Sequence, residues 1–91
     1  MARLQAEEID AKLVQLDGWS RQGETIVSEH KSDDFLGSLA FVNRVAPLAE
    51  DMNHHPDLAI SWDTVTVTLT THSEGGLTQK DFTLAERIDS L

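Results

Sequence analysis

The chain has 91 residues, a net charge of −9 and no cysteine. This favours one small domain and excludes a disulfide scaffold, a thiol nucleophile and a cysteine-based zinc site. Seven scattered Lys and Arg residues face sixteen carboxylates, so direct binding of nucleic acid or an anionic membrane is not expected. No apolar run approaches the roughly 20 residues that span a bilayer, and no signal-peptide pattern opens the sequence. We therefore expect a cytoplasmic protein that acts on a small molecule or binds other proteins.

The N-terminal third predicts a helix followed by a hairpin. One helix face carries apolar residues at i, i+4 and i+7, namely Ile9, Leu13 and Leu16. Gly18 ends this helix, and residues 1–6 are expected to be a frayed N-terminus. Residues 19–21 and 24–29 then flank a glycine turn at Gly23, which is typical of a hairpin.

A long helix is predicted to follow and to end near Met52. Ser32 is a good N-cap, and the acidic pair Asp33 and Asp34 suits the positive end of a helix dipole. The spacing 4, 3, 4, 3 predicts one buried stripe, formed by Phe35, Leu39, Val42, Ala46 and Ala49.

After residue 56 the apolar period changes from 3.6 to 2, which predicts a second hairpin with its turn at Asp63. Its aliphatic face consists of Leu58, Ile60, Trp62, Val65, Val67 and Leu69. Thr78 and Asp81 then form a capping-box variant that opens a last helix. The predicted buried side of that helix consists of Leu84, Ala85, Ile88 and Leu91.

The order of elements is therefore α-β-β-α-β-β-α. Strands with one apolar face, joined in hairpins, indicate an antiparallel sheet. We expect a two-layer α+β fold in a single domain over residues 1–91, with a four-stranded antiparallel sheet and three helices on one face.

Three histidines are the best candidates for chemistry: His54 and His55 at the end of the long helix, and His72 at the end of the last strand. Glu50 lies four residues before His54, so both should share one helix face, where the carboxylate would favour a protonated imidazole. Such a pair suits general acid–base catalysis near neutral pH.

Other interpretations of these residues stay open. His55 before a proline is often only a surface cap, His72 can be a solvated strand residue, and Asp81 fits a capping role alone. His54, His55 and His72 with a carboxylate could in principle bind zinc, but adjacent histidines diverge and rarely chelate one ion, so no metal is expected. His30 has no partner in sequence and is expected on the surface.

Two segments together resemble the signature of the pterin-4a-carbinolamine dehydratases. Residues 50–57 read EDMNHHPD and residues 71–81 read THSEGGLTQKD, with Trp62 between them. The resemblance extends over roughly residues 9–88 and agrees with the predicted order of elements. It implies dehydration of a 4a-hydroxytetrahydropterin to the quinonoid dihydropterin, which recycles the cofactor of aromatic amino acid hydroxylases. It implies no metal or organic cofactor, and it implies a homo-oligomer.

The resemblance also suggests roles for individual residues. It implies that His54 and His72 are the acid and base, and that His55 orients the substrate or shares the proton transfer. Glu50 would tune His54, and Asp81 would support the pocket near His72. The implied substrate-binding residues are Trp19, Trp62, Pro56 and Asp57.

One departure from the family pattern lies before the long helix. Members usually carry two aromatic residues where this chain has His30 and Ser32. This difference motivates an alternative function on the same fold, a pterin-binding or protein-interaction module with weak or no turnover, such as a dimerisation partner or coactivator.

Overall fold

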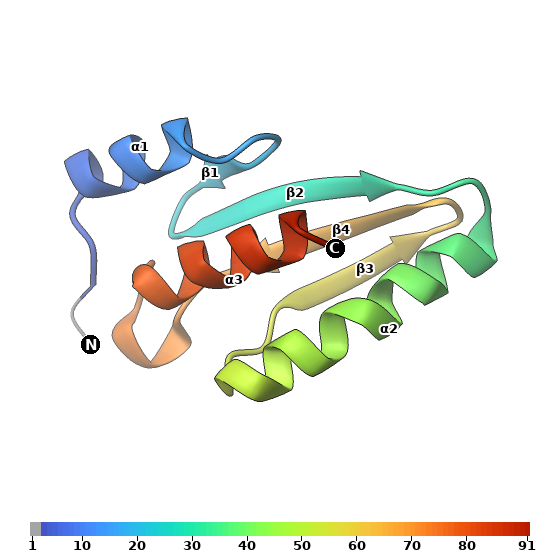
Figure 1. Ribbon diagram of the computed structural model, residues 1–91. Coiled ribbons are helices and arrows are strands. Elements are labelled where there is room, and N and C mark those ends of the chain that lie inside the picture. Colours follow the sequence, from blue (N-terminus) through green and yellow to red (C-terminus); the bar gives the residue numbers. More distant parts are fainter. Residues whose placement is uncertain (1–2) are drawn as a thin grey trace.

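The computed structural model describes residues 3–91 and has three α-helices, four strands and one 3₁₀ turn (Figure 1). In chain order these elements are α1 (Ala6–Val14), β1 (Ser20–Gln22), β2 (Thr25–Lys31), α2 (Phe35–Met52), β3 (Asp57–Ser61), β4 (Thr64–Leu69), η1 (His72–Glu74) and α3 (Gln79–Asp89). The order of helices and strands is the one that the periodicity predicts.

The four strands form one antiparallel sheet in the order β1-β2-β4-β3. The two hairpins therefore meet through β2 and β4, where Ile26 pairs with Leu69 and Lys31 pairs with Thr64. This long central pairing leaves β1 and β3 as the two edges of the sheet.

All three helices pack on the aliphatic face of the sheet. Ile9 of α1, Phe41 of α2 and Phe82 of α3 join one apolar cluster with strand residues such as Ile26 and Val67. The opposite face carries the threonines of β4, which alternate with its buried aliphatic residues. The predicted α+β class and the one-sided arrangement of the helices are confirmed.

The predicted buried stripe of the long helix is wrong, because a different side of the helix faces the sheet. The residues that α2 buries are Ser38, Phe41, Val45 and Ala49, whereas Phe35, Leu36 and Leu39 are exposed. Apolar residues lie on two sides of this helix, so spacing alone does not identify the inner one. The helix also begins later than predicted, because Asp34 is the N-cap and accepts a hydrogen bond from the Gly37 amide.

Three smaller expectations are also wrong. Trp62 lies in the turn after β3 with a positive φ of 52° and is 69% exposed, so it does not extend the strand. Leu91 is exposed rather than buried. Residues 3–6 are not frayed, because the Leu4 amide donates to the Leu77 carbonyl at 2.8 Å and α1 begins at Ala6; residues 1–2 lie outside the described part.

His30 is half-buried between aromatic side chains, contrary to the free surface position expected from sequence. Its ring stacks on Phe41 at 4.5 Å between centroids and meets the edge of Trp19 at 6.0 Å. It thus takes an aromatic packing position beside the core, but its Nε2 is buried and has no hydrogen-bond partner among residues 3–91. Burial lowers the pKa of His30 below its usual 6.5, and the negative charge of Asp89 opposes this shift only in part.

This environment predicts an acid-sensitive contribution to stability. Because the folded-state pKa of His30 lies below 6.5, the unfolded chain binds the proton more readily. The stabilisation is therefore complete above pH 6.5 and is lost as pH falls from 6.5 through the folded-state pKa. His30→Phe should make the melting temperature fall less between pH 7 and pH 5 than in the wild type. Equal slopes in the two proteins would contradict this assignment.

Candidate functional site

The site begins where α2 ends. Asn53 adopts the left-handed conformation with φ 48° and ψ 44°, which asparagine tolerates better than most residues. The His54 amide donates to the Ala49 carbonyl at 3.0 Å and the Asn53 amide donates to the Glu50 carbonyl at 3.1 Å. These two bonds form a Schellman motif, which turns the chain sharply out of the helix.

This turn separates the two adjacent histidines. His54 points into the protein and is 8% exposed, with its Nε2 2.6 Å from Asp81 Oδ1. The His55 side chain is 56% exposed, and its Nε2 bonds to Glu50 Oε2 on the surface. Each histidine therefore has its own carboxylate partner.

These pairs correct one expectation and extend another. Glu50 contacts His55 and not His54, because the helix ends at Met52 and the i, i+4 rule does not extend to a residue beyond the left-handed turn. Asp81, expected to support the pocket near His72, binds His54 directly and also contacts Thr71, the residue before His72, so only the partner of Glu50 is wrong.

The environment of Asp81 is fully buried and polar. Its Oδ2 accepts hydrogen bonds from the Thr71 hydroxyl and from the Thr78 amide, both at 2.9 Å. Asp81 and Thr78 also form the predicted capping box at the start of α3, where the helix dipole favours a negative charge. One carboxylate thus caps a helix and holds a histidine.

His72 follows Thr71 directly and opens the η1 turn as an exposed residue. The chain then returns through Gly75, whose φ of 71° requires the left-handed region, and Thr71 and Gly76 form a bridge. The loop therefore places His72 directly after Thr71. The Thr71 hydroxyl contacts Asp81, which is the partner of His54.

The sequence assigns no role in the site to Asn53 or Thr71. It predicts Thr78 as a helix cap but not its contact with Thr71. The signal for Asn53 is an asparagine at the end of a predicted helix, a common left-handed cap. The contact between Thr71 and Thr78 joins two different elements, and no rule of residue spacing predicts it.

The predicted substrate-binding residues fall into two groups. Pro56 and Asp57 follow His55 directly and lead into β3. Trp19 is a core residue whose Nε1 donates to Asp89 at 3.0 Å, at the end of α3 far from Asp81. Trp62 lies beyond the other end of β3, about 17 Å from Asp57 for five extended residues. In the described part of the chain, neither tryptophan therefore lies beside the His54–Asp81 pair.

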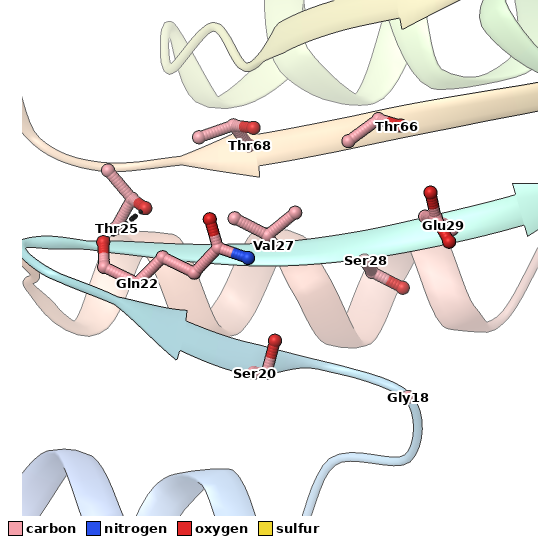
Figure 2. Close-up of a pocket in the computed structure, with 9 residues that line it drawn as sticks. All are labelled: Gly18, Ser20, Gln22, Thr25, Val27, Ser28, Glu29, Thr66 and Thr68. Atoms are coloured by element: carbon pink, nitrogen blue, oxygen red, sulfur yellow. Dashed lines mark hydrogen bonds between the residues drawn. The ribbon is translucent and has the colours of Figure 1, made fainter. Parts of the chain in front are cut away.

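Two depressions lie elsewhere on the surface. One, of ≈ 590 Å³, lies on the open face of the sheet, and Figure 2 shows Gln22, Thr66 and Thr68 around it. The other, of ≈ 370 Å³, is lined by His30 and the end of α3. Neither is lined by His54, His55 or His72. In residues 3–91, no three histidine or carboxylate side chains converge to bind a metal ion, and none of the helices there is long and apolar enough to cross a membrane.

The sequence is similar to those of one known family. The family model described as "Pterin 4 alpha carbinolamine dehydratase" matches residues 2–91. A protein of Thermosynechococcus vestitus that carries the name pterin-4-alpha-carbinolamine dehydratase provisionally is 52% identical over 89 residues, covering 98% of this chain and 94% of the relative. A provisionally named dehydratase of Mycobacteroides abscessus is 48% identical, with 99% of this chain and 96% of the relative covered.

Solved structures show the same fold. A transcriptional coactivator/pterin dehydratase from Brucella melitensis superposes with a TM-score of 0.92 and 36% identity, covering 97% of this chain and 96% of that one. A pterin dehydratase-like RuBisCO assembly factor of the alpha-carboxysome has a TM-score of 0.68 at 22% identity, covering 81% and 88%, and shares the fold alone. The chain belongs to the pterin-4a-carbinolamine dehydratase family.

Proposed function

We propose that this protein dehydrates 4a-hydroxytetrahydropterin to quinonoid dihydropterin and so recycles the cofactor of aromatic amino acid hydroxylases. The observation that carries this proposal is the pairing of buried His54 with Asp81, which also accepts from Thr71, the residue directly before exposed His72. Family membership supports the reaction class. No cofactor is required by the proposed chemistry.

The reaction needs two proton transfers. One proton goes to the 4a-hydroxyl, whose C–O bond breaks to release water, and one leaves a ring nitrogen as the C=N bond forms. Positioned histidines suit both transfers. We assign the acid and base to His54 and His72, with Asp81 holding His54 in place.

Substrate contacts belong to the residues that surround this pair. His55, held by Glu50 on the surface, would orient the pterin or share the proton transfer. Pro56 and Asp57 would line the same side, because they continue the chain from His55.

The test is to measure dehydration of the 4a-hydroxypterin and substrate binding in the same preparation. Wild-type protein should accelerate dehydration, and the double variant His54→Ala with His72→Ala should bring the rate down to that of the uncatalysed reaction. A double variant that matches the wild type would refute the assigned acid and base.

A second candidate function is a protein-interaction module on this fold with weak or no turnover. Two observations favour it: a relative at 36% identity is described as a coactivator as well as a dehydratase, and α2 exposes Phe35 and Leu36 on its outer side. Pterin binding without turnover would support this module, whereas normal turnover would exclude it.

We also propose that the protein assembles with itself as a dimer or tetramer. The edge strand β3 is unpaired on one side and exposes Ile60, and Trp62 follows it. Antiparallel pairing of two such edges across a twofold axis would place the Trp62 end of one copy beside the Asp57 end of the other. Sedimentation that shows only monomer at assay concentrations would contradict this assembly.

A further inference from the structure

Two threonine hydroxyls connect the start of α3 to the His54–Asp81 pair. Thr71 Oγ1 lies 2.8 Å from Thr78 Oγ1 and 2.9 Å from Asp81 Oδ2. All three residues are buried, with Thr78 and Asp81 at 0% exposure and Thr71 at 8%. These groups therefore have to satisfy one another, because buried polar groups without partners are costly.

The direction of each hydrogen bond follows from the donors that are present. Thr78 Oγ1 accepts from the Lys80 amide at 3.3 Å, so its own proton is free to point to Thr71. Thr71 Oγ1 accepts that proton and donates its own to the Asp81 carboxylate, which as an ion can only accept. The chain of donors thus runs from the helix amide through Thr78 and Thr71 to Asp81.

The carboxylate passes this order on to His54. Asp81 Oδ2 is occupied by the Thr71 hydroxyl and the Thr78 amide, which leaves Oδ1 for the imidazole. The group at 2.6 Å from Oδ1 is His54 Nε2, and two atoms that can only accept would repel at this distance. Nε2 must therefore carry a proton in the neutral ring, and Nδ1 must be the bare nitrogen.

We propose that Thr71 and Thr78 are positioning residues: they occupy Asp81 Oδ2 and so hold the His54 ring at Oδ1 in one orientation, as the Nε2–H tautomer, with Nδ1 as the nitrogen that exchanges a proton with the substrate. The last clause rests on the proposed function, whereas the tautomer does not. The hydroxyl chain acts only through Asp81, and neither threonine needs to touch the pterin.

Nitrogen NMR of the histidine side chains tests the tautomer without any turnover. In wild-type protein, at a pH where the rings are neutral, His54 should show a protonated Nε2 and a bare Nδ1. Thr71→Val keeps the shape of the side chain but removes the donor to Asp81 Oδ2. Asp81 Oδ1 still accepts from Nε2, so the tautomer should be retained, but the ring should be held less firmly and its Nε2–H signal should broaden. Thr71→Ser restores a hydroxyl and should restore the wild-type spectrum. A protonated Nδ1 in wild-type protein would overturn the proposal whether or not any variant folds.

Kinetics give a separate readout. Thr71→Val should lower kcat about tenfold with little change in KM, because partners that orient a reacting group typically contribute on this scale. Thr71→Ser should recover most of the loss. Unchanged kcat with an unchanged Nε2–H signal in Thr71→Val would refute the positioning role. A broadened Nε2–H signal in Thr71→Val, when the wild-type protein has no dehydratase activity, would support the positioning and refute the proposed function instead.

Discussion

Replacing His54 with glutamine should lower the rate of 4a-hydroxypterin dehydration by about 10²–10⁴-fold while the fold is retained. The glutamine amide can occupy the position of Nε2 and donate to Asp81, so the buried carboxylate keeps a partner. It cannot exchange a proton at the position of Nδ1. Steady-state kinetics with the 4a-hydroxypterin, together with a thermal melt, separates the loss of chemistry from a loss of folding.

His55→Gln is the matched comparison for this variant. His55 and its partner Glu50 have side chains that are 56% and 75% exposed, so their orientation is less restricted and the loss should be smaller. His30→Phe serves as the remote control, because His30 lies against the opposite end of α3. Equal losses for His54→Gln and His55→Gln would show that burial beside Asp81 does not distinguish their roles.

Removing the carboxylate in Asp81→Ala should produce the largest loss of stability, about 3–5 kcal/mol. Three buried donors lose their acceptor at once: His54 Nε2, the Thr71 hydroxyl and the Thr78 amide. The capping box of α3 is lost with them. For a chain of this length the melting temperature should fall by about 10 °C or more.

Urea denaturation of Asp81→Ala and Glu86→Ala measures this effect against a control. Glu86 is an exposed acidic residue of the same helix, so its replacement should change stability by less than about 0.5 kcal/mol. The stability of Asp81→Asn should fall between those of the two variants. The amide oxygen still accepts hydrogen bonds, but the amide NH₂ group faces groups that are themselves donors. Similar midpoints for Asp81→Ala and Glu86→Ala would show that the buried network contributes little to folding.

The arrangement of secondary structure could be read from the sequence because its signals are local. Alternation over residues 64–69 and the Thr78–Asp81 capping box depend only on neighbouring residues, and both are confirmed. The inner face of α2 could not be identified in this way. Both Phe35 and Phe41 lie on apolar stripes, and only contact with the sheet decides which one is buried.

The site shows the same division between local and distant information. The residues of the candidate site are the ones that the motif indicates, but their pairing depends on the backbone at Asn53 and on a contact across 27 positions between His54 and Asp81. A helical extrapolation to His54 gives it the wrong carboxylate. The position of His30 is mispredicted for a different reason. Histidine is a polar residue type, so the sequence does not indicate that its ring packs against aromatic side chains.

The left-handed backbone of Asn53 determines that the side chains of His54 and His55 point in different directions. No side-chain packing between His54 and His55 is needed to keep them apart, because a single positive φ directs one ring inward and the other outward. The pair is therefore robust to changes in the surrounding core and sensitive to one backbone preference. Glycine could replace Asn53 and preserve this turn, whereas a β-branched residue there would strain the backbone, because its side chain disfavours the positive φ that directs the two rings apart.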